Sequence, residues 1–336
     1  MNLARYEEIC AGFSESRVLV IGDLILDQFI WGRVSRISPE APVPVVEVDR
    51  ETQYPGGAAN VARNLREFTP HTSVLGMIGA DGDGDTLKRL LTDAGIQIEG
   101  VQQEAGYSTI VKTRIIARHQ QLVRVDRERK LRPTQEQFDR ALAAIDDMLP
   151  HLDAVIVEDY GKGLIRQGFA DEIVALVRGA GRVLAIDPNP QNPLAWHGAS
   201  VMKPNRSEAF AAAGLPHSEP VEPVENDEAV REVGRILLDR WACENLLITL
   251  GEQGMMLFRP GEAPFHTPTR AKEVFDVSGA GDTAIALFTL ALTAGAEAAE
   301  AAEISNHASG IVVGKLGTAT VSPAELLRSF SGGEAQ

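Results

Sequence analysis

Short apolar runs that alternate with amphipathic helical patterns are the feature that most constrains the fold of this chain. The apolar runs cover residues 17–21, 73–78, 154–157, 182–186 and 245–250, and the helical patterns cover residues 58–68, 85–94, 134–149, 168–180 and 227–241. Strands and helices that alternate in this way form a mainly parallel sheet with helices on both faces. We therefore predict an α/β fold in which residues 1–336 make a single three-layer domain.

Two segments interrupt this alternation, at about 29–54 and 109–125. Both are rich in β-branched residues with an apolar and polar period of two, and the first contains three prolines, which suit edge strands. We predict that they form antiparallel strands outside the main sheet, as a small β-lid on the domain. The apolar positions of this lid predict a homodimer in which each lid packs against a second copy.

The charge balance excludes several classes of partner. There are 32 Lys and Arg residues against 47 Asp and Glu residues, a net charge of −15, which repels nucleic acid and anionic lipid surfaces. Only Cys10 and Cys243 occur, so no disulfide framework or zinc cluster of cysteines is expected. No stretch approaches the roughly 20 apolar residues of a membrane-spanning helix, and we expect a cytoplasmic protein.

The segment FDVSGAGDT, which opens directly into an apolar helical stretch, predicts an anion site. Backbone amides of Gly279, Ala280 and Gly281 meet the positive end of the helix dipole there. Asp282 follows in the first helical turn, within reach of a hydroxyl group that attacks a phosphate held by this loop, and can serve as its base. The alternative is an ordinary first-turn acid that complements the helix dipole.

Two other nucleotide-binding motifs fit less well. The segment SGIVVGKL at 309–316 has Ser309 in place of the first glycine of a Walker A loop and Leu316 in place of its Ser or Thr. Gly279, Gly281 and Ala284 satisfy a loose dinucleotide pattern, but only about fifty residues follow, too few for a nucleotide-binding half.

A second glycine motif lies upstream, where Gly56 and Gly57 precede a helical pattern that contains Asn60. The glycines let a ligand approach the backbone, and the Asn60 amide can bind a polyol, although a simple loop-to-helix turn would look the same. Together, GGAANVA and DVSGAGDT strongly resemble the two signatures of the ribokinase-like, or PfkB, carbohydrate kinase family. The resemblance extends from about 22 to 317.

This resemblance implies a ribokinase-like fold and a kinase that uses ATP with Mg²⁺. It implies that Asp282 is the catalytic base and that the loop 279–281 is the anion hole for the transferred phosphoryl group. It also assigns the nucleotide side of the site, with Glu208 helping to order the magnesium ion: the residues concerned are Asn205, Glu208, Thr249, Gly251, Gly254 and Asn306.

Substrate choice is expected in the N-terminal half. Asp23 and Asp27 follow the first strand and can bind sugar hydroxyls, together with the Gly56–Asn60 segment. The second lid segment and the motif EDYGKG add charged side chains: Lys112, Arg114, Arg118, Arg124, Asp159 and Lys162. A local set of cations on an acidic chain suggests that the sugar already carries a phosphate, although a solvated strand face is the common alternative.

Four segments narrow the resemblance: GDLILDQFIWG, RISPEAPVPVVEV, YPGGAANVARNL and EDYGKG. They are similar to the D-glycero-β-D-manno-heptose 7-phosphate kinases of ADP-heptose and lipopolysaccharide core biosynthesis, which implies phosphorylation at O1 to give the 1,7-bisphosphate. We expect the stand-alone kinase form. One departure is Asn189, where fused relatives often carry Lys. The alternatives are another sugar or sugar-phosphate kinase of this family, or a sugar-binding regulator without turnover.

Overall fold

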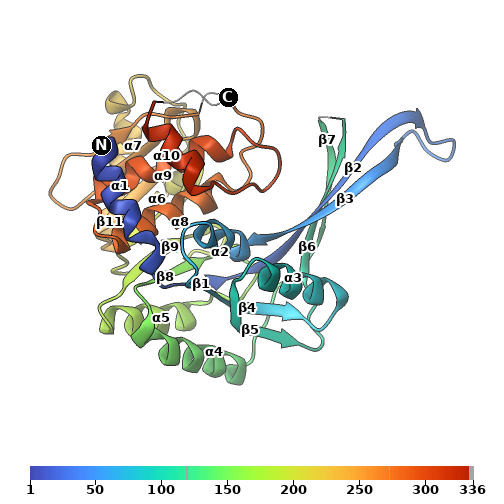
Figure 1. Ribbon diagram of the computed structural model, residues 1–336, viewed down its shortest axis with the longest axis horizontal. Helices are drawn as coiled ribbons and strands as arrows, with labels where there is room; N and C mark the ends of the chain where they lie inside the picture. The colour runs from blue at the N-terminus through green and yellow to red at the C-terminus, as the bar shows by residue number, and fades with distance from the viewer. Residues whose placement is uncertain (119, 272, 333–336) are drawn as a thin grey trace.

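The computed structural model describes residues 1–118, 120–271 and 273–332, and nine strands of these residues form one central sheet (Figure 1). Its order is β13-β12-β11-β10-β9-β8-β1-β4-β5. All neighbouring strands pair parallel except at one edge, where β11, β12 and β13 are antiparallel. The strands are β1 Val18–Gly22, β4 Thr72–Gly79, β5 Gln97–Glu104, β8 Ala154–Glu158, β9 Val183–Asp187, β10 Val201–Met202, β11 Asn245–Thr249, β12 Met255–Phe258 and β13 Phe265–Thr267.

Helices cover both faces of this sheet, as the alternation of elements predicts. They are α1 Leu3–Ala11, α2 Ala58–Arg66, α3 Gly82–Asp93, α4 Gln135–Met148, α5 Gln167–Gly179, α6 Arg206–Ala213, α7 Glu228–Trp241, α8 Ala280–Thr293, α9 Ala298–Val312 and α10 Pro323–Phe330. Each predicted helix and strand is present, with ends shifted by a few residues at most. None of the helices in the described residues is long and apolar enough to span a bilayer.

The two faces of the sheet build two separate cores because neighbouring side chains on a strand point to opposite sides. In β1, Val18 and Val20 belong to the core under α1, α2, α8 and α9, whereas Leu19 and Ile21 belong to the core under α4, α5, α6 and α7. The apolar helix α8 lies at the centre of the first core, packed against α2 and α9. This packing fixes the start of α8 over the sheet.

The lid is a separate sheet of four strands in the order β3-β2-β6-β7, and it projects away from the body (Figure 1). Its strands are β2 Leu24–Ile37, β3 Pro44–Gly57, β6 Ile110–Ala117 and β7 Gln120–Arg127. The lid is therefore longer than the predicted 29–54 and 109–125, because its strands begin directly at the main sheet.

The prediction of a wholly antiparallel lid is wrong in one respect. The β2–β3 and β6–β7 pairs are antiparallel, but β2 and β6 pair in parallel at the centre of the lid. The reason is that β2 follows β1 and β6 follows β5, two strands of the same parallel sheet. Both lid strands leave the carboxyl edge of that sheet and therefore run in the same direction.

Candidate active site

Asp282 lies in the first turn of α8, with 8% of its surface exposed. Both of its carboxylate oxygens accept hydrogen bonds from distant parts of the chain: Oδ2 from Asn60 Nδ2 at 2.7 Å and Oδ1 from the Tyr160 hydroxyl at 2.8 Å. Burial raises the pKa of Asp282, and the bonds from Asn60 and Tyr160 act against this rise. The arrangement holds a carboxyl group in one orientation at the edge of a cavity.

The glycine loop is shaped by the left-handed backbone of Gly279, which has φ = 81° and caps α8. A Cβ atom at this position would lie 2.8 Å from Asn60 Nδ2, so any side chain would disturb the amide that contacts Asp282. The first amides of a helix have no partner within it and can bind an anion. The amide of Ala280 is already used, because it donates to the carbonyl of Val277.

Lys203 places a buried cation beside this loop, a feature that sequence reasoning missed. Its Nζ lies 2.8 Å from Asp187 Oδ2 and 3.2 Å from where a Cβ atom of Gly281 would be. Burial alone would lower the pKa of Lys203, but the carboxylates of Asp187 and Glu158 raise it and keep the lysine charged. The signal that could have found it is a lysine directly after the short β10 strand and before Asn205.

The predicted sugar ligands Asp23 and Asp27 lie where the lid joins the body. Asp23 is 1% exposed, and its Oδ2 accepts the backbone amides of Tyr160 at 3.1 Å and Lys162 at 3.0 Å. Asp27 Oδ1 pairs with Arg114 at 2.5 Å. A Cβ atom on Gly56 would collide with the Asp27 carboxylate, and Gly57, with φ = 59°, caps α2. The glycine pair therefore serves close packing at this junction.

Three of the predicted cations lie on one face of the lid, because Arg114 and Arg124 are cross-strand partners and Lys112 is two residues before Arg114. Lys112 lies over the Tyr160 ring at 5.5 Å, and Lys162 pairs with Glu128 at 2.8 Å. Burial and then Lys162 lower the pKa of Lys112, which indicates that the two positive charges are near one another. Arg124 pairs with Asp126, and Arg118 is exposed at the outer end of β6, where its amide bonds to Gly32.

Asp159 is used inside the protein. Its carboxylate accepts the amide of Gly161 at 2.8 Å and the Asn192 side chain at 2.7 Å, and it is 6% exposed. Burial raises its pKa to about 6. These contacts hold the loop that carries Tyr160 and Lys162.

Two cavities meet at Gly281, next to Asp282. One, of about 550 Å³, is lined by the candidate base, the glycine loop, Lys203, Asn205, Glu208 and Thr249. The other, of about 420 Å³, is lined by Thr249, Gly251, Gly254, Gly281 and Asn306. The predicted nucleotide residues therefore line adjoining spaces that converge on the candidate base.

The local roles of three of these residues are structural in the chain itself. Asn205 and Glu208 form a reciprocal capping box at the start of α6, with Glu208 Oε2 accepting the Asn205 amide at 2.8 Å. Asn306 is 3% exposed and donates to Thr267 Oγ1 and to the Pro268 carbonyl. Among the described residues there is no group of three His, Cys, Asp or Glu side chains arranged as a metal site.

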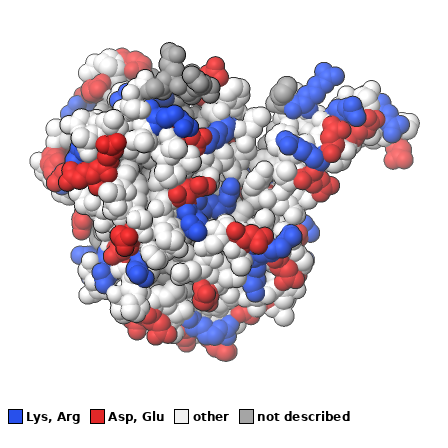
Figure 2. Space-filling model, in the orientation of Figure 1, with Lys and Arg blue, Asp and Glu red and all other residues white. Residues whose placement is uncertain are grey.

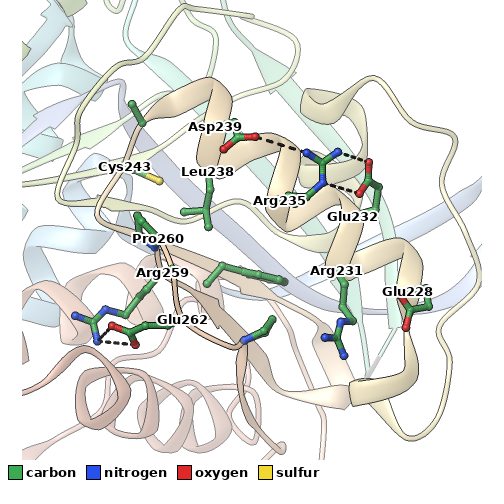
Figure 3. Close-up of a pocket in the computed structure, with 14 residues that line it drawn as sticks. Glu228, Arg231, Glu232, Arg235, Leu238, Asp239, Cys243, Arg259, Pro260 and Glu262 are labelled. Atoms are coloured by element: carbon green, nitrogen blue, oxygen red, sulfur yellow. Dashed lines mark hydrogen bonds and ion pairs between the residues drawn. The ribbon is translucent and has the colours of Figure 1, made fainter.

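A larger hollow, of about 830 Å³, lies between α7 and the β12–β13 edge (Figure 3). Its charged groups neutralise one another: Arg235 pairs with Glu232 and Asp239, and Arg259 pairs with Glu262. None of the sequence-predicted site residues lines it. We therefore place the candidate active site at the cavities beside Asp282.

Solved sugar kinases share this architecture. Ribokinase from Arabidopsis thaliana, complexed with ribose and ATP, matches with a TM-score of 0.68 and 17% identity, over 94% of this chain and 98% of that chain. Phosphofructokinase-2 from Escherichia coli, in complex with substrates and products, matches with a TM-score of 0.76 and 16% identity, over 94% and 99%. At such identities the likeness shows the fold alone, which is the predicted ribokinase-like α/β fold.

Residues 15–325 match the model of the pfkB family carbohydrate kinases, and the chain belongs to that family of ATP-dependent phosphotransferases. It is also similar to two proteins named "Bifunctional protein HldE". The one from Desulfatibacillum aliphaticivorans is 43% identical over 314 residues, 94% of this chain and 63% of the relative. The one from Geobacter sulfurreducens is 39% identical over 330 residues, 98% and 66%. The chain thus spans less than two thirds of the length of these relatives.

Proposed function

We propose that this kinase transfers the γ-phosphoryl group of ATP to O1 of D-glycero-β-D-manno-heptose 7-phosphate, which forms the 1,7-bisphosphate in ADP-heptose synthesis. The observation that carries the kinase chemistry is Asp282, held between Asn60 and Tyr160 at the mouth of the glycine loop. The choice of sugar is supported by the four sequence segments that resemble heptose 7-phosphate kinases and by the similarity to the HldE proteins.

In this mechanism Asp282 takes the proton of the anomeric hydroxyl as its oxygen attacks the γ-phosphorus. The amide of Gly281 and the ammonium of Lys203 line the same cavity as the carboxylate and offset negative charge on the transferred group. Because Lys203 is held by Asp187, its position is set before ATP arrives.

The cavity lined by Asp282, Lys203 and Glu208 also fits Mg²⁺. This ion binds few protein oxygens and keeps waters and substrate phosphates as its other ligands. Glu208 lines this cavity and would hold the ion indirectly. When bound, Mg²⁺ supplies charge neutralisation for the nucleotide phosphates. The adjoining cavity with Thr249, Gly254 and Asn306 would take the nucleoside.

The acceptor would lie between the Gly56–Asn60 segment and the base of the lid, with Asp23 and Asp27 near its hydroxyls. Lys112 and Lys162 are the cations best placed for its phosphate, because they lie beside Tyr160 and near Asp23. Arg114, which pairs with Asp27, borders the same region. Arg118 is too far along the lid to take part in the same contact.

We also propose a homodimer formed through the lid. Apolar side chains stand exposed on three of its strands: Ile37 at 61%, Val48 at 53%, Val123 at 48% and Val125 at 52%. The β7 strand is exposed along its whole length and is an unpaired edge in the single chain. Packing of one lid against another would remove this apolar surface from water.

A panel of acceptors in an ADP-release assay tests the proposal. Heptose 7-phosphate should be used at least about 100-fold better in kcat/KM than unphosphorylated heptose, because two charge-assisted contacts are lost with the phosphate. Ribose and fructose 6-phosphate should be poor acceptors, and phosphorus NMR should locate the new phosphate at O1. Equal rates with and without the 7-phosphate would reject this acceptor while leaving the carbohydrate kinase class in place.

A further inference from the structure

Tyr160 contacts three parts of the candidate site at once. Its backbone amide donates to Asp23 Oδ2 at 3.1 Å, and its hydroxyl donates to Asp282 Oδ1 at 2.8 Å. Its ring carries the Lys112 ammonium at 5.5 Å from the ring centre. These partners come from the end of β1, the start of α8 and the lid strand β6, so one side chain joins the body to the lid.

We propose that Tyr160 is a positioning residue that orients the candidate base through its hydroxyl and ties that base to the acceptor cation Lys112 through its ring. The inference deepens the proposed function and rests on it for the role of Asp282. It adds a residue that the glycine motifs do not reveal, since 122 residues separate Tyr160 from Asp282.

The hydroxyl has a defined effect on the carboxylate. A donated hydrogen bond stabilises the charged form of Asp282, which is the form that can accept a proton. Without it, Oδ1 loses its only side-chain donor among the described residues, while Oδ2 keeps Asn60. The carboxyl group is then free to turn and harder to ionise.

Other charged groups near Asp282 also influence the ionisation of its carboxyl group. They are Asp27 from β2, Glu158 from β8, Asp187 from β9 and Lys203 after β10. Arg63 from α2 donates to Asn60, the other partner of Asp282. The carboxylates disfavour ionisation of Asp282 and Lys203 favours it, and none of them changes when the Tyr160 hydroxyl is removed. Burial with Asp282 nearby raises the pKa of Tyr160, so the phenol stays a donor across the working range.

The ring has a separable effect on the acceptor side. Its face attracts the Lys112 ammonium, a contact that phenylalanine keeps and leucine removes. Tyr160→Phe therefore isolates the bond to Asp282, and Tyr160→Leu removes both links. If the ring positions Lys112, only the leucine variant should weaken binding of a phosphorylated acceptor.

The first experiment compares pH profiles of kcat/KM for the wild type, Tyr160→Phe and Tyr160→Leu, with the best acceptor from the panel. In Tyr160→Phe the acid limb should move up by about 1 to 2 pH units, as expected for the loss of one hydrogen bond to a charged group. Its kcat should fall while KM for the acceptor stays within about twofold. In Tyr160→Leu the acid limb should move equally, and KM for a phosphorylated acceptor should rise in addition.

Tyr6→Phe is the matched control, because Tyr6 is a tyrosine of α1 that is buried at 2% exposure and stacks on Phe330. Its pH profile should match that of the wild type. Thermal unfolding of all variants checks that phenylalanine, which fills the volume of the tyrosine ring, leaves the fold intact.

A second experiment needs no turnover, and so separates this inference from the proposed function. The side-chain carboxyl carbon of Asp282 is followed by NMR through a pH titration in aspartate-labelled protein, with Asp282→Asn used to assign the signal. The titration midpoint should be higher in Tyr160→Phe than in the wild type and in Tyr6→Phe. An unchanged midpoint together with an unchanged acid limb would overturn the role of Tyr160. A raised midpoint in a protein that does not use heptose 7-phosphate would support it and reject only the acceptor.

Discussion

The body and the lid differ in how far the chain itself buries their side chains. In the body, the candidate base has a donor on each carboxylate oxygen, and Lys203 is 2% exposed and paired. In the lid, β7 is exposed along its length and apolar side chains face solvent. Figure 2 shows positive and negative side chains interspersed along the projecting lid. The comparison shows that the groups around the candidate base come from one chain, whereas the exposed apolar strands of the lid leave a surface for the proposed second copy.

The largest effect is expected from the body, with Asp282→Asn. Loss of the base should reduce kcat by at least about 100-fold, because general base catalysis contributes on this scale. Asparagine fills the same space, so binding of the acceptor and the melting temperature should change little. Steady-state kinetics and thermal unfolding measure both. Near-normal turnover by the folded variant would contradict the role of Asp282.

At the base of the lid, Lys112→Met should act on substrate choice alone. We expect kcat/KM for a phosphorylated acceptor to fall about 10- to 100-fold, since one charge-assisted hydrogen bond is lost. The rate with the unphosphorylated sugar should not change. Arg33→Met, which removes an exposed lid cation at 65% side-chain exposure, is the control and should leave both rates unaltered. Equal losses with both sugars would show that Lys112 does not bind the phosphate of the acceptor.

Val125→Asp tests whether the exposed apolar side chains of the lid pack against a second copy of the chain. A charge on the β7 edge should weaken the dimer by about tenfold or more in Kd, because a carboxylate would lose its water in the contact. Sedimentation velocity across a concentration series measures this. Val221→Asp, at a similarly exposed valine outside the lid, is the matched control. A wild type that stays monomeric at micromolar concentration with full activity would reject the dimer.

Glu208→Gln separates two roles of one side chain in the body. Glutamine can still accept the Asn205 amide and complete the capping box of α6, so stability should be kept. The lost charge should raise the Mg²⁺ concentration needed for half-maximal rate severalfold. A magnesium titration of the rate gives the answer, and an unaltered half-maximal concentration would remove Glu208 from the ion.

The smallest effect concerns stability of the body away from the site. Burial lowers the pKa of His307 to about 4. The unfolded chain takes up a proton below about pH 6.5, which the folded chain does not bind until about pH 4. This group therefore contributes stability that is present at neutral pH and lost as the pH falls through this window. His307→Gln should flatten the fall in melting temperature between pH 7 and 4.5, whereas the exposed His197→Gln should not.

How much of this could be predicted depends on the sequence distance over which each feature is encoded. The glycine loop and Asp282 are adjacent in the chain, so a short motif records them. Asn205 and Glu208 are also close in the chain, but their spacing fits a helix cap and a nucleotide site equally well. The contact between Tyr160 and Asp282 depends on where β8 and α8 meet, and no local pattern records it.

The same limit explains the other differences. Lys203 looks like an ordinary surface lysine until the parallel order of β9 and β10 sets it beside Asp187. The parallel pair at the centre of the lid follows from the direction of β1 and β5, which alternation of apolar residues does not encode. The cations of the second lid segment share a period, but the strand spreads Lys112 and Arg118 apart along its length.

Residues 105–109 and 128–134 link the β6–β7 half of the lid to the body, but the β2–β3 half is joined to it without a linker. Only Asp23 separates β1 from β2, and β3 ends at Gly57 where α2 begins at Ala58. Both of these junctions, from β1 to β2 and from β3 to α2, lie at residues that we assign to the acceptor site. Grafting the lid of another sugar kinase onto this body would therefore cut and rejoin the chain inside that site. A chimera that exchanges the lid should therefore also exchange the segment from Asp23 to Asn60, which forms part of the proposed acceptor site.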